Sequence, residues 1–282
     1  MLKYRLIFGP IMIAGLVALL WSDQAFGDAG NWPGLLILLV MVLPGIRLAA
    51  GELSGLFKAK GVQSGPQVLT LIAALGCIEV YALLLAEPRD QFGRAMMVAT
   101  AAVFAVIFGM CWQARSRETR DTMLAGAIAG FIFVYLGIMP GFMLAIRIEH
   151  SAWVLGAVLL VTKSCDIGAY FTGRALGKHK LISWLSPGKT WEGLAGGLIL
   201  AGVASLLLLM PLADLPVLYA LFAGAVLGLV GQGGDLIASM LKRDAGVKDS
   251  GSSIPGFGGI LDVIDSPLIA APVGFWLLYA YA

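Results

Sequence analysis

Long apolar segments separated by short polar connections determine what this chain can fold into. A helix needs about 20 mainly apolar residues to cross the hydrocarbon core of a membrane. We place such segments at 5–21, 34–50, 67–86, 94–112, 123–145, 152–172, 193–211, 216–234 and 266–282. Only 13% of the residues are charged, against about 25% in soluble domains. The sequence therefore predicts an all-α fold, a polytopic membrane helix bundle of about nine transmembrane helices.

Glycine spacing indicates that these helices pack closely. Small residues four positions apart let membrane helices approach one another. Three segments carry such pairs, which are Gly126 with Gly130, Gly193 with Gly197, and Gly224 with Gly228. The long polar loops all follow residue 150, so we divide the chain into N-terminal transmembrane scaffold helices, 1–150, and a catalytic transmembrane domain, 151–282.

Basic residues are distributed unevenly between alternate connections. Lys and Arg concentrate on the cytoplasmic side of membrane proteins. With the N-terminus inside, fourteen of the nineteen basic residues fall on that side, namely Lys3, Arg5, Lys58, Lys60, Arg115, Arg117, Arg120, Arg174, Lys178, Lys180, Lys189, Lys242, Arg243 and Lys248. The opposite side holds only Arg89, Arg94 and Arg147. We therefore expect a multi-pass protein of the inner (cytoplasmic) membrane, with loops 173–192 and 235–265 in the cytoplasm.

The first apolar segment has two interpretations. Its basic start, its apolar run and the small residues at Ala25-Phe26-Gly27 fit a signal peptide. The uneven distribution of basic residues requires this segment to cross the membrane. We therefore expect a retained helix.

The first of two polar blocks in the second half of the chain begins inside a predicted helix. Lys163 and Asp166 lie three residues apart and share one helical face. Several glycines and lysines follow, and a Ser-Pro-Gly-Lys sequence then opens the next helix. Backbone amides at a helix N-terminus beside lysines are typical of a phosphate site. The spacing of a Walker motif is absent.

The second polar block supplies acids. Asp235 ends the eighth segment, Asp249 follows Lys248, and Asp262 and Asp265 lie three residues apart before the last segment. Carboxylate oxygens bind Mg²⁺, and nearby cations stabilise the charge that develops in phosphoryl chemistry. Any one of these acids alone is typical of a solvated loop. Their combination with two basic loops on one side predicts nucleotide chemistry.

Three segments in the second half form one ordered pattern. They are Asp166-x-Gly168-Ala169-Tyr170-Phe171-x-Gly173-Arg174, Ser186-Pro187-Gly188-Lys189-Thr190-Trp191-Glu192-Gly193 and Ser239-x-x-Lys242-Arg243-x-x-x-x-Lys248-Asp249-x-Gly251-x-x-Ile254-Pro255-Gly256-x-Gly258-Gly259-Ile260-x-Asp262-x-Ile264-Asp265. This pattern resembles the signature of the phosphatidate cytidylyltransferases, the CDP-diacylglycerol synthases. The likeness is dense over about 160–275 and weak before it.

The resemblance implies a reaction and a set of site residues. The reaction is CTP + phosphatidate → CDP-diacylglycerol + pyrophosphate, in phospholipid biosynthesis. Mg²⁺, with a second cation left open, is then expected at Asp235 and Asp262, with Asp249 and Asp265 as further ligands. Catalytic contacts to the phosphates are expected from Lys189, Lys242, Arg243, Lys248 and Asp249. Nucleotide binding is expected from Asp166, Arg174, Ser186, Lys189 and Ser239.

The expected partners follow from the same resemblance. They are CTP, phosphatidate and the lipid bilayer, without a nucleic acid, and a homodimer is left open. Two positions depart from the family pattern, which usually has histidine where this chain has Phe257 and arginine where it has Val263. Phe257 cannot transfer a proton, and Val263 lacks a guanidinium that pairs with phosphate.

Two other functions compete with this interpretation. An ion-coupled transporter would use charges inside predicted helices, such as Arg47, Glu79, Lys163 and Asp166. It would also spread its acids through the bilayer, whereas this chain gathers them in one half. Another metal-dependent membrane transferase is compatible with the Asp262-x-x-Asp265 pair alone.

Overall fold

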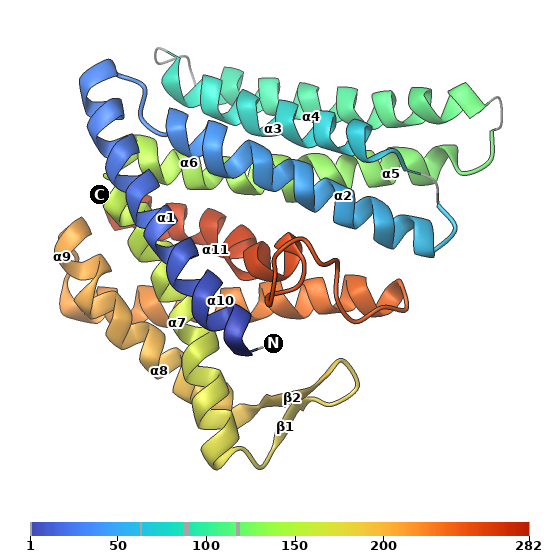
Figure 1. Ribbon diagram of the computed structural model, residues 1–282. Coiled ribbons are helices and arrows are strands. Elements are labelled where there is room, and N and C mark those ends of the chain that lie inside the picture. The colour runs from blue at the N-terminus through green and yellow to red at the C-terminus, as the bar shows by residue number, and fades with distance from the viewer. Residues whose placement is uncertain (1, 63, 87–90, 117–118, 282) are drawn as a thin grey trace.

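Helices form most of the chain in a computed structural model, which describes residues 2–62, 64–86, 91–116 and 119–281 (Figure 1). Arg89 and Arg117, used above to predict the topology, lie outside the described residues. The elements are α1 (Leu2–Gly30), the π-helix η1 (Ile37–Val42), α2 (Leu43–Ala59), α3 (Pro66–Leu85), α4 (Gln91–Gln113), the 3₁₀ turn η2 (Ala114–Ser116), α5 (Thr122–Ile132), the π-helix η3 (Phe133–Ile138), α6 (Met139–Glu149), α7 (Ala152–Leu176), β1 (Lys180–Ile182), β2 (Ser186–Thr190), α8 (Trp191–Leu207), α9 (Leu209–Ala213), α10 (Val217–Asp244) and α11 (Ile260–Tyr281).

Eight helical segments within the described residues are long and apolar enough to cross a membrane. They are Phe8–Gly30, Ile37–Ala59, Pro66–Leu85, Gly93–Gln113, Thr122–Glu149, Ala152–Leu176, Val217–Asp244 and Ile260–Tyr281. The all-α polytopic bundle is therefore confirmed, but the count of nine is not. The segment expected at 193–211 ends as α8 after 17 residues. Pro211 has no N–H to donate to the carbonyl of Leu207, which explains why the helix breaks at Leu208.

The two polar blocks are more ordered than the sequence predicts. The expected loop 173–192 contains an antiparallel hairpin of β1 and β2, in which Lys180 pairs with Thr190. The expected loop 235–265 shrinks to 245–259, because α10 continues to Asp244 and α11 begins at Ile260. Asp235 therefore lies within α10, and Asp262 and Asp265 lie within α11.

Glycines bring α7, α8 and α10 close together, as the spacing predicts. A Cβ atom built on Gly197 would lie 2.7 Å from the carbonyl oxygen of Cys165 in α7. One built on Gly224 would lie 2.5 Å from the carbonyl oxygen of Ala201 in α8. Gly126 and Gly130 face α4 in the same manner. Any larger side chain at these contacts would push the helices apart.

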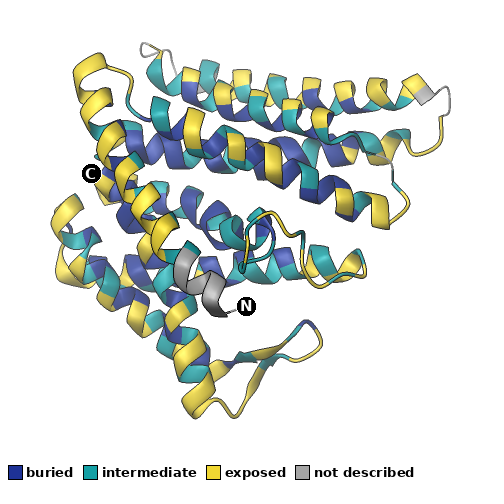
Figure 2. Ribbon diagram, viewed as in Figure 1, coloured by how far each residue is buried: buried dark blue, intermediate teal, exposed yellow. Residues whose placement is uncertain are grey.

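A buried ion pair ties α1 to the rest of the bundle. Arg147 of α6, expected on the non-cytoplasmic side, is only 3% exposed, and its Nε lies 2.7 Å from Asp23 Oδ2 of α1. The same Asp23 carboxylate accepts hydrogen bonds from the backbone N–H groups of Gly34 and Leu36. Many described side chains of α1 and α4 are exposed, whereas buried residues gather along α2, α3 and α6 (Figure 2). These exposed apolar surfaces are suited to lipid contact.

Candidate active site

Four of the five predicted nucleotide-binding residues, all but Ser239, meet in one cavity. This cavity has a volume of about 410 Å³ and lies between α7, the β1–β2 hairpin, α8 and α10. Its lining includes Asp166, Arg174, Ser186, Lys189 and Asp235. The lysine comes from β2, the first two residues from α7, and Asp235 from α10. Residues separated by up to 69 positions in the sequence, Asp166 and Asp235, thus face the same space.

An ion pair connects the hairpin to α10 at this cavity. Lys189 Nζ lies 2.6 Å from Asp235 Oδ2, with the two side chains 18% and 32% exposed. Because both groups are mostly shielded from solvent, their attraction is stronger than that of a surface pair. The pair fixes the Lys189 ammonium group at the cavity wall, where it can also meet an anion.

Glu192 holds the base of the hairpin. Its carboxylate accepts hydrogen bonds from the backbone N–H groups of Lys178 and His179, and it lies 2.6 Å from His179 Nδ1. The hydrogen bond with His179 and the backbone hydrogen bonds lower the pKa of Glu192 from 4.5 to about 2. Thr190 caps α8 beside it by accepting a hydrogen bond from the N–H of Gly193. These contacts orient β2 and therefore Lys189.

A polar network lies beside the cavity between α7, α10 and α11. Lys163 Nζ is 3.3 Å from Asp166 Oδ2 and 3.5 Å from Asp265 Oδ1. Gln232 of α10 donates a hydrogen bond of 2.6 Å to Asp166 Oδ1. The predicted Lys163–Asp166 contact is therefore confirmed, and it extends to Asp265, which is only 3% exposed. A Cβ on Gly234 would lie 2.6 Å from the carbonyl oxygen of Asp265, so α10 and α11 touch closely here.

Asp262 forms a second cluster at the start of α11. Lys242 Nζ of α10 lies 2.5 Å from Asp262 Oδ1. The other carboxylate oxygen, Oδ2, accepts hydrogen bonds from the backbone N–H groups of Gly259 (3.0 Å) and Ser250 (3.3 Å). Ser250 Oγ lies 3.0 Å from the same oxygen. Both oxygens of Asp262 are therefore held in place by named donors.

Four predicted residues are not drawn into these contacts. Arg243 Nη1 donates to the carbonyl oxygen of Val247 at 3.0 Å, which closes the turn after α10. Lys248 and Asp249 are exposed, and Ser239 is half-buried on α10 outside the cavity lining. The structure therefore groups Lys189 with Asp235 and Lys242 with Asp262, and leaves the 248–249 pair on the surface.

The two departures from the family pattern lie near the Asp262 cluster in the chain. Phe257 is half-buried, and a Cβ on Gly9 of α1 would lie 3.7 Å from its Cζ atom. Val263 is half-buried in the first turn of α11. Phe257 therefore gives the loop an apolar contact with α1, which a histidine would make less favourable.

The acids of the candidate site offer carboxylate oxygens as donors for a metal ion. Carboxylate oxygens are the ligands that Mg²⁺ prefers, and Asp235 and Asp262 both offer them beside a lysine. Among the described residues, no three His, Cys, Asp or Glu side chains gather into a metal-binding cluster. Carboxylate donors suit Mg²⁺, and its assignment to Asp235 and Asp262, with Asp249 and Asp265 as further ligands, stays a prediction.

Residues that the sequence did not single out complete the site. Gln232 binds Asp166, and Ser250 binds Asp262. Glu52 of α2, about 200 positions earlier in the chain, accepts a hydrogen bond of 2.8 Å from the Ser250 hydroxyl. Gln232 could have been found from the sequence, because it lies three residues before Asp235 and therefore on the same face of α10. No local pattern indicates a contact of Glu52 with a loop so distant in sequence.

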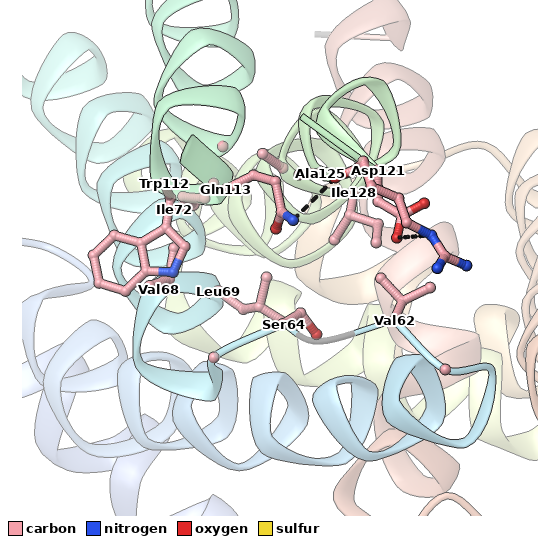
Figure 3. A pocket seen from close by; sticks show the side chains of 15 residues that line it. Val62, Ser64, Val68, Leu69, Ile72, Trp112, Gln113, Asp121, Ala125 and Ile128 are labelled. Carbon is pink, nitrogen blue, oxygen red and sulfur yellow. Dashed lines mark hydrogen bonds and ion pairs between the residues drawn. The ribbon is translucent and has the colours of Figure 1, made fainter. Parts of the chain in front are cut away.

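A second cavity of about 410 Å³ lies away from this site, between the α2–α3 connection, α3, α4 and α5 (Figure 3). Its polar groups include Ser64, Gln113 and Asp121. Gln113 Nε2 donates to the carbonyl oxygen of Arg120 at 3.1 Å, so that part of this polar surface is already paired. None of the predicted site residues lines this cavity.

Comparison with known proteins decides the family. The sequence model of the cytidylyltransferase family matches residues 3–281. The chain belongs to the cytidylyltransferase family. This confirms the resemblance seen in the sequence, and the match extends well beyond the three segments that carried it.

Curated relatives of this cytidylyltransferase come from several bacteria. It is 37% identical to the phosphatidate cytidylyltransferase of Bacillus subtilis (strain 168), over 64% of this chain and 68% of that protein. It is 32% identical to the phosphatidate cytidylyltransferase of Pseudomonas aeruginosa, over 87% of this chain and 94% of that protein. It is also 41% identical to the uncharacterized protein YnbB of Escherichia coli (strain K12), where the chain spans only 57% of the relative's length.

Proposed function

We propose that this chain is a phosphatidate cytidylyltransferase, which transfers the CMP moiety of CTP to phosphatidate and releases pyrophosphate. The observation that carries the proposal is the cavity lined by Arg174, Lys189, Asp166 and Asp235 in a member of the cytidylyltransferase family. The substrates in this proposal, CTP and phosphatidate, follow from relatives in bacteria and in a plant that are named phosphatidate cytidylyltransferase. CDP-diacylglycerol is the product in phospholipid biosynthesis.

The chemistry needs alignment and charge neutralisation more than an activated nucleophile. An anionic oxygen of the phosphatidate phosphate attacks the α-phosphorus of CTP. The new P–O bond forms as the bond from the α-phosphorus to the oxygen bridging the β-phosphate breaks, and pyrophosphate leaves with that electron pair. Two polyanions must approach one another, so positioned cations lower the barrier. We assign Lys189 and Lys242 to this role, together with Arg243 and Lys248.

Acids complete the proposed site. We propose Asp235 and Asp262 as the residues that hold Mg²⁺, with Asp249 and Asp265 in supporting positions and a second cation left open. Bound Mg²⁺ supplies positive charge to the phosphate oxygens. Asp166 orients Lys163, to which it is paired, and Arg174, Ser186 and Ser239 complete the contacts to CTP.

The membrane arrangement follows from the basic residues. We propose that loop 245–259 and the hairpin lie in the cytoplasm, at the inner membrane of the cell, where CTP is present. Both lie toward the same side of the bundle, at the right of Figure 1. A homodimer stays a prediction, and no nucleic-acid partner is proposed.

The transporter interpretation finds less support. Lys163 and Asp166 belong to the proposed site. Glu79 instead lines an apolar cavity between α3 and α4, and no ion pair joins it to Arg47 among the described residues. The intramembrane charges therefore do not form one pathway through the bundle.

One substitution tests the proposal directly. The purified protein, given radiolabelled CTP, phosphatidate and Mg²⁺, should form a chloroform-soluble labelled product. Asp262→Asn should abolish this product, because the carboxylate charge beside Lys242 is lost. Asp244→Asn is the matched control, since Asp244 is exposed and pairs with Lys60 at the surface. Near-normal turnover of Asp262→Asn, with intact folding in detergent, would contradict the assignment.

A further inference from the structure

Glu52 is a buried acid in a helix expected to act only as scaffold. Its side chain projects from α2 and is 8% exposed. No ion pair with Glu52 is found among the described residues. Burying a carboxylate without compensation costs several kcal/mol. The protein must therefore stabilise this charge through hydrogen bonds, and these identify what Glu52 binds.

Among the described residues, the four hydrogen bonds that Glu52 accepts all come from the second polar block. Oε1 accepts from Ser253 Oγ at 2.5 Å and from the backbone N–H of Ile260 at 2.8 Å. Oε2 accepts from Ser250 Oγ at 2.8 Å and from the backbone N–H of Leu261 at 3.0 Å. We call this set of contacts the Glu52 clamp. It joins α2 to both ends of the loop segment 250–261.

The clamp performs the work of a helix cap for α11. The first N–H groups of a helix lack partners within the helix, and the residue before it normally supplies a side-chain oxygen. That position is Gly259, which has no side chain. Glu52 provides the acceptor instead, and its negative charge interacts favourably with the positive end of the helix dipole. A Cβ on Gly259 would overlap Glu52 Oε2 and Ser250 Oγ, so the glycine is required.

The clamp also reaches Asp262 through one hydroxyl group. Ser250 Oγ lies 2.8 Å from Glu52 Oε2 and 3.0 Å from Asp262 Oδ2. A serine hydroxyl has one proton to donate, so the two carboxylates share a single donor. The backbone N–H of Gly259 binds Asp262 Oδ2 from the other side. Glu52 therefore holds the Ser250 hydroxyl and the start of α11, which carry part of the hydrogen-bond set of Asp262.

From this geometry we infer that Glu52 is a positioning residue for Asp262, acting through Ser250 and the first turn of α11. The inference rests on the proposed function, in which Asp262 serves nucleotide transfer. Glu52 does not touch the cavity that holds Lys189 and Arg174. Its substitution should therefore change the Mg²⁺ requirement and kcat more than the KM for CTP.

The first measurement needs no substrate. Hydrogen–deuterium exchange of the full chain in detergent reports on the backbone N–H groups of Ile260 and Leu261. In Glu52→Gln, an NH₂ group replaces one acceptor oxygen, and we expect at least one of these N–H groups to exchange about tenfold faster. Glu79→Gln is the matched control, because Glu79 lies in the neighbouring helix α3 on the cavity beside α4, and within the described part of the chain no hydrogen bond or ion pair joins it to this loop. Unchanged exchange in Glu52→Gln would overturn the clamp.

The second measurement separates positioning from simple anchoring. In Glu52→Gln we expect kcat to fall at least tenfold and half-maximal activity to need several-fold more Mg²⁺, with partial recovery in Glu52→Asp. Faster exchange with unchanged kcat and Mg²⁺ requirement would overturn the positioning role. If Glu52→Gln fails to fold, Ser253→Ala removes only one contact of the clamp. It should then show the same changes on a smaller scale, and normal exchange and kinetics in it would count against the inference.

A double-mutant cycle tests the route through Ser250. Because Glu52 is inferred to act through this hydroxyl, the combination of Glu52→Gln with Ser250→Ala should be little worse than the more damaging single variant. Fully additive losses in kcat would overturn the route. A wild-type chain that forms no CDP-diacylglycerol would overturn the proposed function, and the exchange measurement would still decide whether Glu52 holds the loop.

Discussion

Lys189 connects the hairpin, the cavity and α10 through one ammonium group. Its partner Asp235 lies 2.6 Å away, and the lysine side chain is mostly buried. We expect Lys189→Ala to lower kcat for CDP-diacylglycerol formation by about 10²–10³, the usual effect of removing one preorganised charge donor. Steady-state kinetics with CTP and phosphatidate measure this change.

A neighbouring lysine provides the control for Lys189. Lys178 is exposed, and only its backbone N–H contacts Glu192. Lys178→Ala should therefore keep most of the activity. Equal losses in the two variants would mean that the general positive charge of the hairpin matters, and not the position of Lys189.

At the residue scale, the sequence predicted contacts that depend on local spacing. Lys163 and Asp166 are three residues apart on one helix, and the structure pairs them. Glu52 could not be foreseen, because its partners lie about 200 positions away and become neighbours only when α2 packs beside α11. Local periodicity carries no information on such pairing.

The hairpin depends on Glu192, a half-buried acid whose pKa is lowered to about 2 mainly by its hydrogen bond with His179. A carboxyl group whose pKa is lowered in the folded state stabilises the folded form at pH values above its ordinary pKa of 4.5. This contribution is lost as the pH falls from 4.5 toward 2. We therefore expect the base of the hairpin to keep its carboxylate contacts throughout the neutral range.

Replacing the carboxylate tests this contact. In Glu192→Gln, the backbone N–H groups of Lys178 and His179 lose an anionic acceptor, and their hydrogen exchange should become about tenfold faster at pH 7. Gln24→Ala serves as the control, because Gln24 binds Asp28 and the backbone of Ala152 at a different site. Unchanged protection in Glu192→Gln would show that strand pairing alone holds the hairpin.

Helix α7 packs against α8 through glycine contacts with no room for a methyl group. A Cβ on Gly168 would lie 2.9 Å from the carbonyl oxygen of Gly196 and 3.0 Å from Gly197 Cα. Because backbone atoms cannot move aside cheaply, we expect Gly168→Ala to destabilise the protein by about 1–3 kcal/mol. The midpoint of thermal unfolding in detergent measures this loss.

The control for this packing is a glycine of α2 with open space around it. A Cβ on Gly45 meets no atom within 4 Å. Gly45→Ala should therefore leave the unfolding midpoint unchanged or raise it slightly, since alanine favours helix. A Gly168→Ala variant as stable as Gly45→Ala would show that α7 and α8 can separate at little cost.

At the scale of elements, the sequence predicted helices better than their ends. The length of the apolar runs located most membrane-spanning segments. Helix α8, however, ends at Leu207, because Pro211 lies within its apolar run. The hairpin was expected to be an irregular loop, because strand pairs of three and five residues are too short for a clear alternating pattern.

The whole molecule should be oriented with its hairpin in the cytoplasm. In a Cys111→Ser background, Lys178→Cys of the hairpin should resist a membrane-impermeant maleimide in intact spheroplasts and react after permeabilisation. Trp32→Cys, in the exposed connection after α1, should react in both. Labelling is read by mass spectrometry of the purified protein. Labelling of Lys178→Cys in intact spheroplasts would reverse the proposed topology.

The cavity beside α7 borders the outer surface of the bundle. Tyr170 lines the cavity, while Ile167 and Phe171 on the same helix are largely exposed apolar residues. Under the proposed function, we expect phosphatidate to keep its acyl chains in the bilayer and to present only its headgroup to Lys189. In mixed micelles, the rate should then follow the mole fraction of phosphatidate in the lipid phase, and dilution with detergent should slow turnover at constant bulk concentration. For this chain the membrane is both the support and the reservoir in which substrate and product diffuse in two dimensions.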